Sequence, residues 1–255
     1  MKSGHDTVQA YIRLQEILES NESLPITQGI VQSIECVLHT WDTAYADALL
    51  IQCGKGIFFN TVARFLPHLS LVEPCAETYI ELQRQYLHLS LYGNHLYHIN
   101  ADAKSFDYTI MIYPALYLHS ADIQEVLREV LRVTSRSVFL LFFNSCSLEY
   151  CLHKIYRRHE YTNSVWYTAS RLQSCVHRIQ RQAVCSFSSL GVLPFSQTVK
   201  KKKRYRIVPY PCGTLGSMCI HIPQNTLLTP IVTPLRRHTK GQLRWGGASS
   251  RSLPE

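Results

Sequence analysis

Residues 48–56 read Ala-Leu-Leu-Ile-Gln-Cys-Gly-Lys-Gly, and this stretch is the most informative about the fold. Its first four residues form a short continuous apolar run, which is typical of a strand buried on both faces of a sheet. Gly54 and Gly56 follow, and residues 57–66 then show a helical pattern. Glycines allow a backbone to approach a ligand closely, and the next helix offers its positive N-terminus. The stretch therefore predicts a strand, a ligand-binding loop and a helix in succession.

The same alternation continues toward residue 144. Further short strands are expected, one of them weak, with amphipathic helices after the second and the fourth. These strands are 69–72, 96–99 (the weak one), 108–112 and 137–143, and the helices are 76–87 and 120–131, with Ser120 as the expected cap. Strands alternating with helices predict a mainly parallel sheet that has helices on both faces.

The flanking parts are less regular. We expect helices within 8–18 and 30–38, further helices around 147–159 and 168–181, and strands at 183–188 and 217–222 that pair antiparallel at one edge. The predicted organisation is N-terminal helices in 1–40, a Rossmann-like core in 41–144, a helical insert with C-terminal strands completing the same domain in 145–235, and a basic flexible tail in 236–255.

An acidic residue lies where a nucleoside ligand would need one. Glu73 ends the strand expected at 69–72 and stands 17 residues after Gly56. In open α/β sheets, ligands bind beyond the carboxyl ends of the strands, where the strand order reverses. The two carboxylate oxygens of Glu73 can accept both hydroxyls of a ribose. Glycine loop and acid together predict a site for a nucleoside-containing cofactor.

These features resemble the class I S-adenosylmethionine-dependent methyltransferases, especially the type 11 group. The stretch 49–56 aligns with that group's hydrophobic-Asp-hydrophobic-Gly-Cys-Gly-x-Gly motif, Glu73-Pro74 with its strand 2 acid and proline, and Phe106-Asp107 with its Phe-Asp before strand 4. Residues 127–133, Leu-Arg-Glu-Val-Leu-Arg-Val, resemble its characteristic helix end. The resemblance implies a Rossmann-like methyltransferase fold with a mostly parallel seven-stranded sheet, helices on both faces and an antiparallel edge hairpin.

The resemblance also implies the activity and the cofactor. The chain would transfer a methyl group from S-adenosyl-L-methionine to an acceptor that the sequence leaves open, as it does the oligomeric state. The cofactor-binding residues implied are Gln52, Cys53, Gly54, Lys55, Gly56, Glu73, Pro74, Asp102 and Tyr113. No catalytic residue is assigned, because methyl transfer needs mainly the alignment of a nucleophile.

Three of the candidate residues have a second interpretation. Asp102 stands where the family often has an acid at the adenine amino group, but it can equally be a solvated loop carboxylate. Tyr113-Pro114 follows strand 4, where substrate and methyl group would meet, or it forms a plain turn. His119 is a candidate base near the pocket, or a surface residue, as a lone histidine more often is.

Two residues depart from the family's glycine motif. Leu50 replaces the acid that opens it, and Gln52 replaces its first glycine. A Gln held at positive φ would cost ~1 kcal/mol or more, and Leu50 offers no hydrogen bond. The alternative hypothesis is therefore a catalytically weakened binding module of the same fold, contacting RNA through residues 200–206. A nicotinamide-dependent oxidoreductase would need a third glycine where Phe59 stands.

Composition and charge limit the classes of protein. Hydrophobic residues make up 46% and charged residues 17%, which is typical of a globular chain. The nine cysteines include no Cys-x-x-Cys pair, so we expect reduced thiols and no metal site, and no apolar run is long enough to span a membrane. We therefore expect a cytoplasmic protein.

The positive charge is concentrated at the C-terminal end. Residues 200–255 hold 11 Lys and Arg against one acid, whereas residues 1–199 hold 15 against 17. The run Lys200–Lys203 is consistent either with RNA binding or with a solvated hairpin loop. The basic balance therefore carries no information about the predicted core.

Overall fold

The protein is described from a computed structural model. The described residues are 9, 11–16, 25–52, 54, 57–86, 90–92, 95–147, 150–151, 165–191, 206–208 and 213–223. The chain divides into two compact units, Met1–Gln224 and Asn225–Glu255. The second unit, with the predicted tail 236–255, lies outside the described residues. Among the described helices, none is both long enough and apolar enough to cross a membrane.

The described strands form one nine-stranded sheet. Its order is β3-β2-β1-β4-β5-β9-β7-β8, and β6 pairs with β5 beside this path. The strands are β1 (Asp47–Ile51), β2 (His68–Val72), β3 (Ser90–Leu91), β4 (Phe106–Met111), β5 (Thr134–Asn144), β6 (Trp166–Tyr167), β7 (Val184–Gly191), β8 (Arg206–Val208) and β9 (Leu215–His221). Strands β1 to β6 pair in parallel, and β5, β9, β7 and β8 pair antiparallel in that order.

The predicted fold class is confirmed. The sheet is mostly parallel with an antiparallel edge, as expected for a Rossmann-like methyltransferase fold. Seven of its strands, β3, β2, β1, β4, β5, β9 and β7, match the expected number, although β3 lies at Ser90–Leu91 and not at the predicted 96–99. Two short strands that the sequence did not predict, β6 and β8, are added to them.

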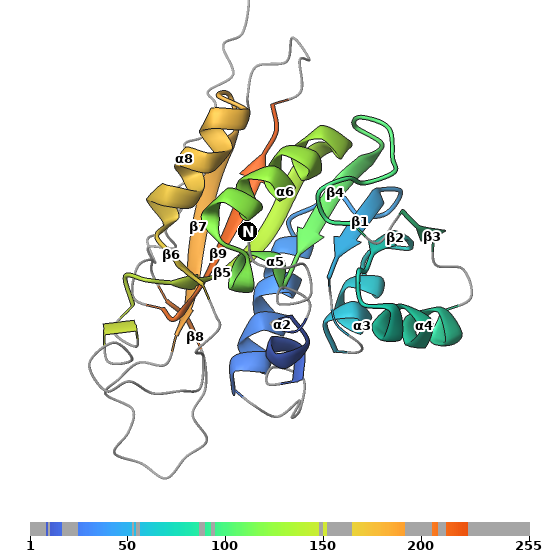
Figure 1. Ribbon diagram of the computed structural model, residues 1–255, viewed down its shortest axis with the longest axis horizontal. Helices are drawn as coiled ribbons and strands as arrows, with labels where there is room; N and C mark the ends of the chain where they lie inside the picture. Colours follow the sequence, from blue (N-terminus) through green and yellow to red (C-terminus); the bar gives the residue numbers. More distant parts are fainter. Residues whose placement is uncertain are drawn as a thin grey trace, which may run out of the picture. The chain divides into compact units, whose positions relative to one another are not determined.

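Helices lie on both faces of the sheet. They are α2 (Pro25–Leu38), α3 (Ile57–Ala63), α4 (Ala76–Gln85), α5 (Pro114–Tyr117), α6 (Ser120–Val133) and α8 (Ala169–Ile179), and residues 11–16 are also helical. The crossover through α3 steps from β1 to β2, whereas the crossover through α6 steps the opposite way, from β4 to β5. Because parallel crossovers are right-handed, these two helices cover opposite faces. Accordingly, α2 contacts α3, and α6 contacts α8 (Figure 1).

Helix α6 shows how the sequence pattern becomes packing. Its apolar positions recur at helical spacing, and all are buried against the core: Ile123, Val126, Leu127, Val130 and Leu131. The expected cap is wrong by one residue, because the helix begins at Ser120 and His119 is the N-cap residue. His119 has extended backbone angles, and its carbonyl oxygen accepts from the amide of Ile123.

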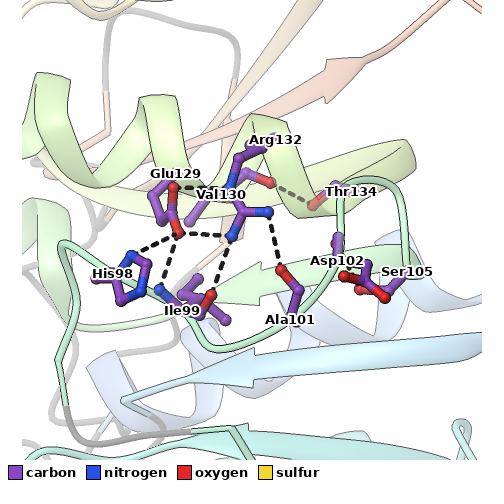
Figure 2. Close-up of polar contacts among 9 residues, drawn as sticks. All are labelled: His98, Ile99, Ala101, Asp102, Ser105, Glu129, Val130, Arg132 and Thr134. Carbon is purple, nitrogen blue, oxygen red and sulfur yellow. Dashed lines mark hydrogen bonds and ion pairs between the residues drawn. The ribbon is translucent and has the colours of Figure 1, made fainter.

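The weak strand expected at 96–99 is wrong. The strand at this place is β3, and residues 98–105 instead form a turn held by α6 (Figure 2). The guanidinium of Arg132 donates to the carbonyl oxygens of Ile99 (2.9 Å) and Ala101 (2.8 Å). A carboxylate oxygen of Glu129 accepts from the Ile99 amide (2.9 Å). Ile99 thus bonds to side chains of α6, not to a neighbouring strand.

The pairing of β5 with β9 depends on a residue without a side chain. Phe142 lies opposite Gly216 in this antiparallel ladder. A Cβ atom at Gly216 would overlap the Phe142 ring. Both residues are buried, so the ring fills the space that a side chain at residue 216 would take.

Candidate functional site

The candidate site lies where the strand order reverses. Strand β1 lies between β2 and β4. The chain goes from β1 through α3 to β2 on one side, and from β4 through α6 to β5 on the other side. The amide of Gln52, directly after β1, donates to the carbonyl oxygen of Val72, the last residue of β2 (3.0 Å). Gln52 and Glu73 are therefore brought together at the carboxyl ends of adjacent strands, the place where open α/β sheets bind ligands.

Glu73 is a buried carboxylate with hydrogen bonds to both oxygens. Only 1% of the residue is exposed. Its Oε1 accepts from the amide of Cys75 (3.0 Å), and its Oε2 accepts from the hydroxyl of Tyr11 (2.9 Å). A buried carboxylate is tolerated only when such donors replace water. The arrangement makes Glu73 a strong acceptor for hydroxyl and amide donors at the end of β2.

The loop after β1 has the backbone shape expected of a glycine loop. Gln52 has a φ of 45° and Gly54 a φ of 76°. Residue 52 thus has the positive φ whose cost is ~1 kcal/mol or more for a residue that has a Cβ atom. The Gln52 side chain is 1% exposed, and its Oε1 accepts a hydrogen bond from the Tyr117 hydroxyl. This bond helps to offset the backbone strain.

Three tyrosines pack beside these two residues. Tyr11, Tyr113 and Tyr117 are all buried. The ring of Tyr11 packs edge-on against Tyr113, with centroids 5.2 Å apart, and tilted against Tyr117 at 5.9 Å. Burial raises the pKa of Tyr117 well above its usual range, and the nearby Glu73 charge raises it further, while the Gln52 bond opposes the shift. The Tyr117 hydroxyl therefore stays protonated at neutral pH and serves as a donor.

Asp102 is not brought to this group. It lies in the turn before β4, where the side chain of Arg132 binds the carbonyl of Ala101 (Figure 2). The carbonyl of Arg132 also accepts from the Lys104 amide. Because α6 runs antiparallel to the strands and β5 begins directly after it, this end of α6 lies at the amino edge of the sheet. Asp102 is exposed there, on the edge opposite Glu73.

The other candidate residues are distributed as follows. Tyr113 is fully buried at the start of α5, and Pro74 is half-buried beside Glu73. Cys53, Lys55 and Gly56, like Lys200–Lys203, lie outside the described residues. His119 is exposed at the start of α6.

Leu50 and the cysteines also have defined places. Leu50 is fully buried within β1, opposite Leu71 of β2 and Ile110 of β4. The described cysteines form no disulfide with one another: Cys36, Cys75, Cys146, Cys151, Cys175, Cys185 and Cys219. In the described part of the chain, no cluster of His, Cys, Asp or Glu could hold a metal ion.

Sequence reasoning missed two residues of the group, Tyr11 and Tyr117. Tyr11 lies 62 positions before Glu73, and no local pattern connects the two. For Tyr117 there was a signal, because it follows Tyr113 by four residues and Pro114 favours a helical start between them. Residues four apart on a helix lie on one face, so the two tyrosines could have been grouped.

The comparisons with known proteins bear on the fold. No family model matches the chain, and no curated protein matches it. Solved structures do. One is a crystal structure of an S-adenosylmethionine-dependent methyltransferase, possible histamine N-methyltransferase, from Thermotoga maritima, with a TM-score of 0.59 and 12% identity over 84% of this chain and 95% of that one. The fold is that of the class I S-adenosylmethionine-dependent methyltransferases.

Two further structures have this methyltransferase fold. Magnesium protoporphyrin IX methyltransferase from Synechocystis PCC 6803, with S-adenosylhomocysteine bound, has a TM-score of 0.55 and 12% identity, covering 76% of this chain and 83% of that chain. A methyltransferase from Archaeoglobus fulgidus has a TM-score of 0.54 and 11% identity, covering 75% and 94%. At these identities the likeness concerns the fold alone.

The residues at the strand ends fit a ligand that contains a ribose. Glu73 provides two carboxylate oxygens, and Oε2 already bonds to a hydroxyl, that of Tyr11, which is the kind of donor a ribose presents. Gly54, at positive φ, has no Cβ atom to keep a ligand from the backbone. The chemistry of the donor and acceptor set thus matches the cofactor that the fold implies.

Proposed function

We propose that the chain is an S-adenosylmethionine-dependent methyltransferase. The observation that carries the proposal is the buried carboxylate of Glu73 at the end of β2, hydrogen-bonded beside Gln52 at the reversal of strand order. A carboxylate costs free energy to bury, and the β2 end could have held an apolar residue. Its presence at the place where this fold receives a nucleoside supports a binding role.

The proposed site is built from the strand ends and the glycine loop. Glu73 would accept the ribose hydroxyls, and residues 52–56 would pass close to the cofactor, with Pro74 beside the acid. Tyr113, fully buried after β4, would lie on the side of the methyl group. Asp102 is left out of the proposed site because it lies at the other edge of the sheet.

Little chemistry is required of the protein itself. The cofactor, when bound, supplies a methyl group on a positively charged sulfur that leaves readily. The chain must hold the acceptor in line with that methyl group and exclude water. The buried tyrosines at the site can do the second, and the protonated Tyr117 hydroxyl can orient a polar group but cannot remove a proton from it.

Calorimetric titration with S-adenosylmethionine and S-adenosylhomocysteine tests the proposal. We expect binding in the micromolar range that Glu73→Gln weakens at least tenfold, because a neutral amide loses the charge-assisted bonds to hydroxyls. Glu77→Gln is the matched control, since Glu77 is exposed in the first turn of α4. If neither the unchanged chain nor Tyr11→Phe binds these ligands at millimolar concentration, the proposal is wrong.

A further inference from the structure

The carboxylate proposed to bind a ribose already carries a hydroxyl from the chain itself. Tyr11 donates to Oε2 of Glu73 at 2.9 Å, and none of the Tyr11 side chain is exposed. A phenol and a sugar hydroxyl both present an O–H donor to a carboxylate oxygen. The other oxygen, Oε1, is bound by the Cys75 amide within the turn after β2 and does not depend on Tyr11.

Tyr11 belongs to a segment that is attached by one face. In residues 11–16, the buried positions are Tyr11, Leu14 and Gln15, which lie on one side of a helical turn. The Tyr11 ring also packs on Tyr113 and Tyr117, which follow β4. One side chain therefore covers both the acid at the end of β2 and the tyrosines at the end of β4.

We propose that residues 11–16 form a cap that competes with the nucleoside ligand. The Tyr11 hydroxyl donates to the Glu73 oxygen that would otherwise accept from a ribose hydroxyl. The inference rests on the proposed function. Ligand binding then requires Tyr11 to leave Glu73, and the ligand's hydroxyl replaces the lost hydrogen bond. The apparent affinity is lowered by the fraction of molecules in which the cap is closed.

Removing the Tyr11 hydroxyl gives the direct test. Tyr11→Phe keeps the ring but leaves Glu73 Oε2 without this donor, so the closed state becomes less stable by one charge-assisted bond. We expect S-adenosylhomocysteine and adenosine to bind Tyr11→Phe about tenfold or more tightly than the unchanged chain. Tyr108→Phe is the matched control, because Tyr108 is a buried tyrosine in the amino half of β4, and its affinity should be unchanged.

A second variant weakens the cap without touching the acid. Leu14→Ala removes a buried side chain from the same face of residues 11–16, and it should also tighten binding. Hydrogen exchange of the unchanged chain provides an independent readout. Amides of residues 11–16 should exchange faster when S-adenosylhomocysteine is added, whereas an ordinary ligand-contacting segment would exchange more slowly.

The outcomes separate the cap from the function. If the unchanged chain binds S-adenosylhomocysteine as tightly as both variants, or if Tyr11→Phe binds more weakly, the cap is wrong and the proposed function stands. If neither the unchanged chain nor any variant binds either ligand, both proposals fall. Tighter binding by both variants, with faster exchange in residues 11–16, supports the cap.

Discussion

The hydroxyl of Tyr117 and the side-chain oxygen of Gln52 are joined by a hydrogen bond, which connects the segment after β4 to the end of β1. The bond lies in the buried interior and involves the residue with the positive φ of 45°. A strained backbone persists when its surroundings hold it. Tyr117 is thus one of the groups that hold Gln52 in a backbone conformation that a glycine would adopt more easily.

Replacing Gln52 by glycine should show this balance. Gln52→Gly relieves the strain but leaves the Tyr117 hydroxyl buried without its partner, so we expect a loss of about 0.5–2 kcal/mol in the free energy of unfolding. In Tyr117→Phe no hydroxyl is stranded, and the same change should become about 1 kcal/mol more favourable. Denaturant unfolding of the four proteins measures the coupling.

Lys104 is the control for the backbone effect. It also has a positive φ, 60°, but it is exposed. Lys104→Gly should therefore leave stability within about 1 kcal/mol, because relief of strain and the greater entropy of the unfolded chain nearly cancel. A coupling energy near zero between Gln52 and Tyr117 would contradict the proposed support.

The guanidinium of Arg132 should stabilise the turn formed by residues 98–105. The Arg132 guanidinium binds the carbonyls of Ile99 and Ala101 together with Glu129, a geometry that a lysine ammonium cannot reproduce. Arg132→Lys should lower the unfolding free energy by about 1 kcal/mol or more and speed hydrogen exchange in 98–105. Arg128→Lys, at an exposed position of the same helix, should do neither.

The hydrogen bonds between Glu129, Arg132 and the Ile99 amide should make the free energy of unfolding depend on pH. Bonding to Arg132 lowers the pKa of Glu129, burial opposes this, and the Ile99 amide lowers it further. Because the folded pKa lies below the unfolded one, the stabilisation is complete above the usual carboxyl range, about pH 4, and is lost as pH falls through the folded pKa.

Thermal unfolding between pH 7 and pH 3 tests this dependence. The difference in Tm between the unchanged chain and Glu129→Gln should shrink as pH falls. Glu125→Gln, at an exposed position of α6, is the matched control. A constant difference for Glu129→Gln would show that its charge contributes nothing.

Because Gly216 lies so close to the Phe142 ring, we expect that adding a side chain at residue 216 lowers the free energy of unfolding. In Gly216→Ala the added methyl group overlaps the Phe142 ring, and overpacking of this kind costs about 1–3 kcal/mol. Phe142→Leu leaves a cavity, but the double change gives the methyl group room. We expect the double variant to be more stable than the sum of the two single losses predicts, as measured by denaturant unfolding.

Local patterns were sufficient for most of the parallel half of the sheet. The apolar run before Gln52, the acid after β2 and the amphipathic spacing of α6 each depend on near neighbours, and each was predicted. The 96–99 segment was not, because the groups that bind Ile99 come from Glu129 and Arg132, some 30 positions later. Without those partners, an isolated apolar run has the composition of a short strand.

The candidate site was predicted only in part for the same reason. Sequence showed Glu73 and the strained Gln52, since both belong to one strand-end pattern. It could not show that Tyr11 donates to Glu73, nor that the turn holding Asp102 is attached at the amino edge. Such facts follow from how distant segments pack, and no spacing along the chain encodes them.

The insertion of β9 between β5 and β7 has a consequence for synthesis of the chain. Both neighbours precede β9 in sequence, so β5 must remain without a partner on one side until residues 215–221 have emerged from the ribosome. Most of β5 is apolar and buried in the finished sheet, and an open apolar edge invites pairing with other chains. Released chains truncated before Leu215 should therefore sediment as aggregates, whereas chains that continue past His221 should not.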